Sequence, residues 1–161
     1  MISQKITDAI NDQIRAEFES AYLYLAMSAY MEGKNFKGIA RWLEKQFEEE
    51  QEHAEKFMKY LYEQGAPVVL EAIAKPSAEF GAPLDVFKAV LKHEQLVTSR
   101  IYKMMDLAKE EKDYASQSML NWFINEQVEE ESAADEIIHK MEFLGNTNSG
   151  LYLLDKELGQ R

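Results

Sequence analysis

The chain has 161 residues, of which 46% are hydrophobic and 29% charged, a balance typical of a globular domain and not of a disordered segment. It has no Cys and only three His, which excludes a disulfide framework, a thiolate nucleophile, a Cys-ligated zinc or iron–sulfur site and a His-rich metal site. Acidic residues outnumber basic ones by 29 to 18, and the net charge of −11 disfavours nucleic acid as a partner and attracts cations.

The N-terminal residues carry no recognisable targeting signal. Residues 1–5 (MISQK) continue directly into a polar, periodic segment, without the apolar run and small-residue cleavage site of an export signal. No stretch approaches the run of about 18 apolar residues that a membrane-spanning helix needs. We therefore expect a soluble cytoplasmic protein without a membrane partner.

Glycine and proline divide the sequence into four long helices and a short fifth one. The three prolines fall between residues 67 and 83, and the rest of the chain is rich in strong helix formers. Pro83 suits the first position of a helix, and Asp113 suits the N-cap of the next one. We expect a single domain over residues 1–161, with helices at about 3–31, 35–64, 83–111, 113–144 and 151–158.

The connection between the second and third helices, residues 66–82, is long for a helical bundle. Its 17 residues could span roughly 56–60 Å when extended, whereas the helix before it is about 45 Å long. A hairpin would not need so long a loop, so the connection is predicted to run the length of the bundle and leave the two helices parallel. The expected fold is an all-α four-helix bundle with a long crossover and a fifth helix.

Each long helix carries one mainly apolar stripe with residues three and four positions apart, the pattern of a helix that faces a bundle core. A carboxylate interrupts every stripe near its middle, and no Lys or Arg occurs on any of them. Glu17 and Glu50 lie equally far from the first turn, so they are predicted to meet across that hairpin. The same symmetry relates Glu94 and Glu130 about the second turn.

Four buried carboxylates without partners would cost several kcal/mol for each ion, whereas two divalent cations would neutralise all four. His53 lies three residues after Glu50 and shares its helix face, which completes the Glu-x-x-His pattern of di-iron carboxylate bundles. The alternative is four protonated or water-bound glutamates, or a register in which they face solvent. A shift of register would also expose all four apolar stripes, so the sequence favours a two-metal site.

The other two histidines are not expected to bind these metal ions. Glu136-x-x-His139 repeats the spacing, but His139 points away from the Glu130 stripe by roughly 180°. We expect it to form an exposed ion pair. His93 is adjacent to Glu94 in the sequence, hence about 100° around the helix, and is expected behind the ligands or at the surface.

The sequence resembles the bacterial non-haem ferritins over its whole length, including the crossover and the fifth helix. The specific part of the resemblance is Glu17, Glu50-x-x-His53, Glu94 and Gln127-x-x-Glu130, with Tyr24 on the same face as Glu17. It implies that Glu17, Glu50 and His53 hold one iron, with Glu50 as a bridge. It further implies that Glu94 and Glu130 hold the second iron, with Gln127 beside them.

The same resemblance implies a third iron site on the cavity side of the subunit, formed by Glu49, Glu126, Glu129 and Glu130. Haem is not expected as a cofactor. Bacterioferritins have a Met at the position of Glu52, and they repeat Glu-x-x-His where this chain has Gln127 and Glu130.

The implied function is iron storage and detoxification by a ferroxidase, an Fe(II):oxygen oxidoreductase of iron homeostasis. Such a protein oxidises Fe²⁺ with O₂ or H₂O₂ at a di-iron site within each subunit and deposits ferric oxyhydroxide in a hollow shell. Tyr24 is implied as a one-electron donor, whereas Trp122 is expected to belong to the core or to an interface. Two alternatives stay open: a di-iron oxidase or peroxide-reducing bundle that stores no mineral, and a non-catalytic helical bundle that binds another protein.

Two segments carry more apolar surface than one bundle can bury. Residues 21–31 (AYLYLAMSAYM) are apolar on nearly all sides of their helix, and the last helix is too short and apolar to stand alone in water. Both are predicted to contact other copies of the chain. The resemblance implies a homo-oligomeric cage of 24 subunits, with the last helices along its fourfold axes.

Overall fold

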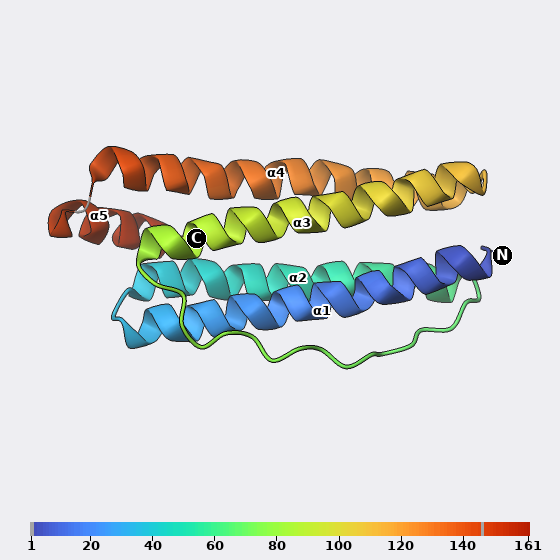
Figure 1. Cartoon of the computed structure of the whole chain (residues 1–161), viewed down its shortest axis with the longest axis horizontal. Helices are drawn as coiled ribbons and strands as arrows, with labels where there is room; N and C mark the ends of the chain where they lie inside the picture. The colour runs from blue at the N-terminus through green and yellow to red at the C-terminus, as the bar shows by residue number, and fades with distance from the viewer. Residues whose placement is uncertain (1, 146) are drawn as a thin grey trace.

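The computed structural model describes residues 2–145 and 147–161, which form five α-helices and no β-strand. Figure 1 shows four long helices packed lengthwise, with a short fifth helix at one end. Their bounds are α1 Gln4–Gly33, α2 Lys37–Glu63, α3 Pro83–Glu110, α4 Tyr114–Leu144 and α5 Asn148–Leu158. The predicted all-α bundle with a fifth helix is confirmed. None of the helices in the described residues has both the length and the hydropathy that crossing a membrane requires.

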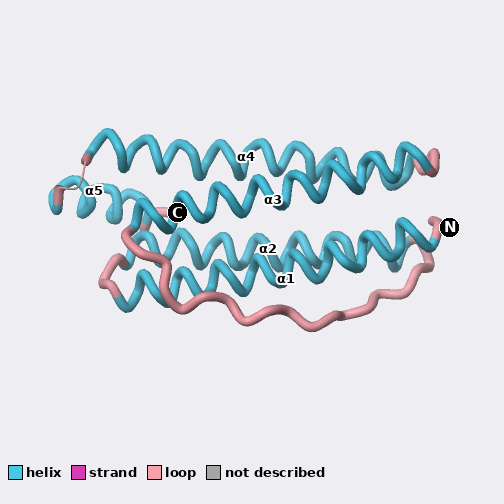
Figure 2. The backbone as a smooth tube through the Cα atoms, viewed as in Figure 1, coloured by secondary structure: helices cyan, strands magenta, loops and turns pink. Residues whose placement is uncertain are grey.

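The connection from α2 to α3 has no regular secondary structure and follows the bundle from one end to the other (Figure 2). Consequently α2 and α3 run parallel, while α1 with α2 and α3 with α4 form antiparallel hairpins. Hydrogen bonds fasten the crossover to α1, and two of them lie near its two ends. The amide of Asn11 donates to the carbonyl oxygen of Pro67 over 3.0 Å, and the hydroxyl of Tyr30 donates to that of Gly81 over 2.9 Å. The predicted crossover topology is therefore confirmed.

α1 ends two residues later than expected because the left-handed residue of its C-terminal turn is Asn35 and not Gly33. Asn35 has a φ of 67°, and the amide of Phe36 donates to the carbonyl oxygen of Met31 over 3.0 Å. This bond satisfies one of the carbonyl groups that a helix end leaves free. α2 consequently begins at Lys37 and not at residue 35.

α5 begins three residues earlier than expected, at Asn148. The hydroxyl of Thr147 accepts a hydrogen bond from the amide of Gly150 over 3.2 Å, so Thr147 is the N-cap and the polar residues after it join the helix. Asn146, which belongs to the expected linker, lies outside the described residues.

Apolar side chains form two separate clusters, and along each long helix a polar layer lies between them. One cluster includes Met31 and Phe87, and the other includes Ile10 and Phe57. Polar residues in the layer that are at most 7% exposed include Gln13, Glu17, Gln46, Glu50, His53, Glu94, Gln127 and Glu130. Burying charged groups at this density is unfavourable unless they find partners. The layer therefore marks the functional part of the bundle.

α5 packs against the first turn of α2 (Figure 1). α2 has no side-chain cap of its own, and instead the amide of Ile39 donates to Oδ1 of Asp155 in α5 over 2.9 Å. Gly38 permits this approach, because a Cβ at that position would overlap the carbonyl oxygen of Asp155. The contact brings Arg161, which follows α5, over the ring of Trp42, with its guanidinium carbon 4.9 Å from the ring centroid.

Candidate metal centre

Each of the four long helices contributes one buried carboxylate to the polar layer. Glu17, Glu50, Glu94 and Glu130 come from α1, α2, α3 and α4 and are between 0 and 7% exposed. His53 lies on the same face of α2 as Glu50 and is 5% exposed. Because each residue occupies a core-facing position of its helix, the helical period directs all five side chains inward.

Glu17, Glu50 and His53 form one group, in which a ligand atom from each lies within 4.8 Å of the other two. The Nδ1 atom of His53 is 3.6 Å from Oε2 of Glu50. Gln13 donates to Oε1 of Glu17 over 2.8 Å, but when both carboxyl groups are ionised, Oε2 of Glu17 and Oε2 of Glu50 have no hydrogen-bond partner in the described part of the chain. A divalent cation would satisfy both oxygens, so this donor set fits a metal ion.

Glu94 lies close enough to this group for its charge to raise the pKa of Glu17 and Glu50, and two donors hold it. The hydroxyl of Tyr24 donates to Oε1 of Glu94. Gln127 donates to Oε2 over 3.0 Å and to the main-chain oxygen of Glu94 over 3.2 Å. The structure therefore places Gln127 beside Glu94.

Glu130 belongs to a second group with His53 and Glu126, whose ligand atoms again lie within 4.8 Å of one another. The Nε2 atom of His53 is 3.9 Å from Oε1 of Glu126. Oε2 of Glu130 accepts a hydrogen bond from Gln46 over 2.7 Å. The imidazole of His53 thus has Glu50 near one nitrogen and Glu126 near the other.

One further acidic residue of the expected third iron site, Glu49, lies at the edge of the polar layer. Both oxygens of Glu49 accept from Nη2 of Arg161, at 2.9 and 2.7 Å. The charge of Glu49 contributes to the raised pKa of Glu130, which places Glu49 on that side of the layer. Glu129 is exposed.

Burial raises the pKa of all four carboxyl groups of the layer. For Glu50, the charges of Glu94 and Glu17 add to this effect, and its pKa lies well above the usual value. Burial and the charge of Glu94 raise the pKa of Glu130 to about 8. In the absence of cations the layer therefore binds protons at neutral pH, and a divalent ion that binds here releases them.

Tyr24 is fully buried, and burial together with the charge of Glu94 raises the pKa of its phenol well above the usual value. The ring of His93 meets the Tyr24 ring edge-to-face, with 6.1 Å between centroids. Nε2 of His93 is 2.7 Å from the hydroxyl oxygen of Ser20, and burial lowers the pKa of this histidine. His93 therefore lies behind Tyr24, outside the two groups of ligand atoms.

Trp122 is 39% exposed and covers the outer side of His53, with 5.5 Å between the two ring centroids in an edge-to-face arrangement. The ammonium group of Lys56 lies 3.9 Å from the centroid of the indole. Within one subunit Trp122 is thus a partly exposed neighbour of the site and not a core residue.

The remaining residues singled out in the sequence lie away from the layer. His139 is 71% exposed and its Nε2 atom is 3.3 Å from Asp135, while Glu136 pairs with Lys140 at 2.8 Å. His139 therefore lies in an exposed ion pair, as expected, although its partner is Asp135 and not Glu136. Glu52 is exposed.

Gln13 and Gln46 are the residues of the site that the sequence reasoning missed. Each interrupts an apolar stripe four residues before a carboxylate and donates its amide to a carboxylate of the layer: Gln13 to Glu17 and Gln46 to Glu130. The position of each glutamine on an apolar stripe could have revealed it, because an amide on a core-facing position needs buried hydrogen-bond partners. Which carboxylate each amide reaches depends on the three-dimensional packing.

A family model described as "Ferritin-like domain" matches residues 7–144. The chain is 39% identical over 161 residues to the bacterial non-heme ferritin of Staphylococcus aureus (strain USA300), covering 100% of this chain and 97% of that protein. It is also 39% identical over 159 residues to a non-heme ferritin-like protein of Haemophilus influenzae, covering 99% and 96%. Among solved structures, the open pore ferritin of the archaeon Archaeoglobus fulgidus has a TM-score of 0.99 at 42% identity, covering 100% of this chain and 99% of that one.

Proposed function

The chain belongs to the ferritin family, and from this premise we propose that it stores iron and oxidises Fe²⁺ at the buried polar layer of each subunit. The observation that carries the proposal is the pair of buried, unpartnered oxygens of Glu17 and Glu50 beside His53. Such a set of carboxylates with one imidazole suits iron as a substrate, although it would also bind zinc or manganese.

In this proposal two Fe²⁺ ions bind side by side as substrates. Glu17, Glu50 and His53 bind the first ion, and Glu94 and Glu130 bind the second, with Gln127 beside them. Glu50 is the bridge, which agrees with its free Oε2 atom and with the effect of Glu94 and Glu17 on its pKa. When the ions bind, the protons held by these carboxyl groups leave, since protons and metal ions compete for the same oxygens.

The reaction proposed for the site is a two-electron reduction of O₂. Two Fe²⁺ ions each give one electron, and O₂ with two protons becomes H₂O₂. The two Fe³⁺ ions then react with four water molecules to give two FeO(OH) units and six protons. Carboxylates suit this turnover, because they change between bridging and terminal binding and hold ferric ion less permanently than thiolates would.

Tyr24 is proposed as an additional one-electron donor to the H₂O₂ formed at the site, which would take one electron from the phenol and one from a third Fe²⁺ ion and, with two protons, become two water molecules. Its hydroxyl already donates to Glu94, so when the phenol loses an electron its proton can pass to Oε1 of that carboxylate. Burial excludes water from the phenol, which protects the oxidised ring from side reactions.

A third iron site is proposed at the edge of the layer, with Glu49, Glu126, Glu129 and Glu130 as its ligands. The group of Glu126, Glu130 and His53 supports part of this set. Glu49 is bound to Arg161, so an ion that uses Glu49 must first displace that guanidinium group.

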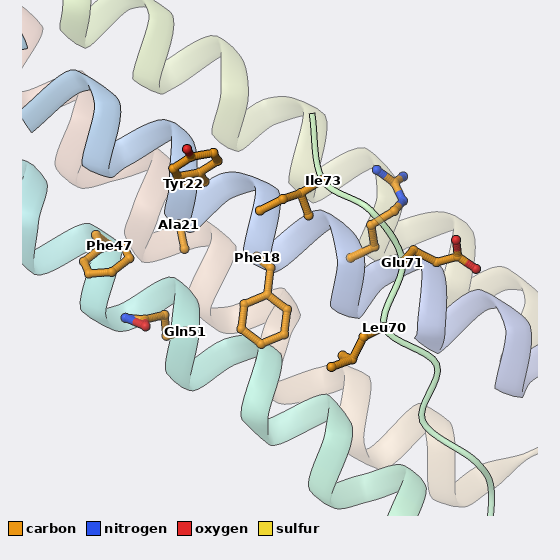
Figure 3. Close-up of a pocket in the computed structure, with 9 residues that line it drawn as sticks. Phe18, Ala21, Tyr22, Phe47, Gln51, Leu70, Glu71 and Ile73 are labelled. Atoms are coloured by element: carbon orange, nitrogen blue, oxygen red, sulfur yellow. The ribbon is translucent and has the colours of Figure 1, made fainter. Parts of the chain in front are cut away.

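Assembly into a shell of 24 subunits is proposed from the resemblance to bacterial non-haem ferritins, and exposed apolar surface supports contacts between copies of the chain. A pocket of about 360 Å³ lies between α1, α2 and the crossover, and Figure 3 shows Phe18 and Phe47 on the helices with Leu70 and Ile73 on the crossover around it. Tyr22 beside it is 43% exposed. A second copy of the chain packed on this face would remove these side chains from water. Twenty-four copies at −11 each would carry a charge of −264, which attracts Fe²⁺.

The test is to mix the metal-free protein with Fe²⁺ in air and follow both oxidation and the iron content of the soluble protein. Storage predicts fast oxidation followed by soluble particles that hold far more than two iron atoms per chain. Oxidation that stops at two ions per chain would favour a di-iron oxidase or peroxide-reducing bundle. No acceleration over buffer would leave a non-catalytic helical bundle.

A further inference from the structure

Glu17 is held by a glutamine that is itself held by an arginine. Nε2 of Gln13 donates to Oε1 of Glu17 over 2.8 Å, and Oε1 of Gln13 accepts from Nε of Arg100 over 2.9 Å. Arg100 comes from α3 and is anchored by Asp12, whose carboxylate accepts at 2.7 Å and whose main-chain oxygen accepts at 3.2 Å. One arginine thus reaches the layer from the surface through a single buried amide.

The same arrangement recurs at Glu130 with residues from other elements. Nε2 of Gln46 donates to Oε2 of Glu130 over 2.7 Å, and Oε1 of Gln46 accepts from Nη1 of Arg161. Arg161 is anchored by Glu49 and by the ring of Trp42. Two unrelated segments of the chain therefore build the same sequence of contacts, from arginine to glutamine to carboxylate.

The chemistry of the guanidinium group fixes the orientation of each amide. Arginine only donates hydrogen bonds, so the glutamine must turn its oxygen toward the arginine and its NH₂ group toward the carboxylate. Without the arginine the amide could rotate and present its oxygen to the carboxylate, which would repel it. The glutamine side chain also lies between the arginine and the carboxylate, so the arginine does not occupy the oxygens that a metal ion needs.

We propose that Arg100 with Gln13, and Arg161 with Gln46, are positioning pairs that each fix one oxygen of a carboxylate and leave its other oxygen free for a metal ion. The proposal rests on the proposed function in taking Fe²⁺ as the ion bound. Oε2 of Glu17 has no partner in the described residues, in agreement with this division. Hydrogen-bond partners of metal ligands typically change metal affinity about 10–100-fold when removed.

The experiment is a titration of the metal-free, assembled protein with Co²⁺, whose visible d–d absorption reports coordination geometry without any redox reaction. Gln13→Leu keeps the volume and burial of the side chain but removes the donor to Glu17. We expect Co²⁺ to bind about 10–100-fold more weakly and its absorption to change. Arg100→Ala is expected to weaken binding in the same direction, and Arg100→Lys, which retains a donor for Gln13, is expected to restore part of the loss.

Matched controls remove one positive charge each at exposed positions. Lys103→Ala lies one turn beyond Arg100 on α3 and is exposed, and Arg41→Ala serves in the same way for Arg161→Ala because Arg41 pairs only with the exposed Glu44 within the described residues. Both control variants are expected to bind Co²⁺ as the wild type does. A similar loss in them would mean that net charge, and not amide orientation, sets the affinity, and the proposal would be wrong.

The variants distinguish a failure of the positioning proposal from a failure to fold and from a failure of the proposed ferroxidase function. If Gln13→Leu fails to fold, Arg100→Ala and Arg161→Ala decide, since both alter partly exposed side chains. Co²⁺ affinities within twofold of the wild type in both arginine variants would overturn the proposal. A wild type that binds Co²⁺ but does not accelerate Fe²⁺ oxidation would refute the ferroxidase function and leave the comparison of Co²⁺ affinities intact.

Discussion

The hydroxyl of Tyr24 on α1 donates its hydrogen to Oε1 of Glu94 on α3, and Gln127 on α4 holds the other oxygen of the same carboxylate. A fully buried phenol is therefore coupled directly to a carboxylate of the polar layer. Because Gln127 remains when the hydroxyl is removed, a variant without it separates the contact of Tyr24 with Glu94 from its proposed role as an electron donor.

Tyr24→Phe tests these roles. We expect Co²⁺ affinity to change little, because Gln127 still orients Glu94, and the initial rate of Fe²⁺ oxidation to fall about tenfold. Any tyrosyl radical signal that freeze-quench electron paramagnetic resonance detects in the wild type should disappear. Tyr22→Phe, on the same helix but 43% exposed, is the control and should behave as the wild type. Equal oxidation rates in the two variants would exclude Tyr24 as a donor.

Loss of a ligand should abolish fast oxidation. In Glu17→Ala, Glu50→Ala and His53→Ala we expect stopped-flow absorbance to show oxidation no faster than in buffer, with assembly unchanged. Removing one buried carboxylate also removes its desolvation cost, so the metal-free variants should fold. His139→Ala, at an exposed position, should retain the wild-type rate. A fast variant among the first three would remove that residue from the ligand set.

The metal-free protein should become less stable as the pH rises from about 5 to 8. The pKa of Glu130 is about 8 in the folded state and near its usual low value in the unfolded state, so between these values the folded state holds a proton that the unfolded state has lost. The free energy of unfolding therefore falls with rising pH over this window. The raised pKa values of Glu17, Glu50 and Glu94 act in the same direction.

Thermal unfolding across this pH range measures the effect. Tm should fall with pH for the metal-free wild type and fall less steeply for Glu130→Gln, which cannot ionise. Co²⁺ should raise Tm most at the alkaline end, because it binds the ionised carboxylates. A metal-free Tm that is flat or rises between pH 5 and 8 would contradict the protonated state of the layer.

Gly38→Ala should displace α5. The added Cβ overlaps the carbonyl oxygen of Asp155, and overpacking of this kind typically costs about 1–3 kcal/mol of unfolding free energy. Gly33→Ala is the matched control, since a Cβ there meets nothing within 4 Å and alanine favours the helix. Denaturant unfolding should show a loss for the first variant only, and equal stability would mean that α5 moves freely at this contact.

Size-exclusion chromatography with light scattering tests the proposed assembly. Twenty-four copies of an 18.6-kDa chain have a mass of about 450 kDa. Leu70→Asp and Tyr22→Asp, which place charges at the pocket between α1, α2 and the crossover, should shift the mass toward smaller species. A monomeric wild type would rule out a shell.

The sequence was sufficient to predict the bundle, its crossover and the inward direction of the five candidate ligands. Helical periodicity is a local property, and a carboxylate that falls in the middle of an apolar stripe must enter the core if the rest of the stripe does. Glu17 and Glu50 could also be paired with each other, because a tight turn makes equal distances along two helices meet.

Other features depend on contacts between segments that no local pattern reveals. Asn35, and not Gly33, takes the left-handed position after α1, because both residue types tolerate it and the packing of the hairpin decides. Asp155 caps α2 from a different helix. Arg100 lies off the stripe of α3, and its bond to Gln13 crosses from one hairpin to the other.

The contact of Asp155 in α5 with Gly38 and Ile39 in α2 has a consequence beyond stability. The same contact carries Arg161 to Gln46 and Glu49, so the element expected to meet neighbouring subunits is joined to the polar layer that is proposed to bind iron. In a shell, contacts with neighbouring subunits would hold α5 in place and so raise the metal affinity of each subunit. A single subunit in which α5 is not held in place would bind iron more weakly. Formation of the ferric mineral would then wait until the shell has assembled.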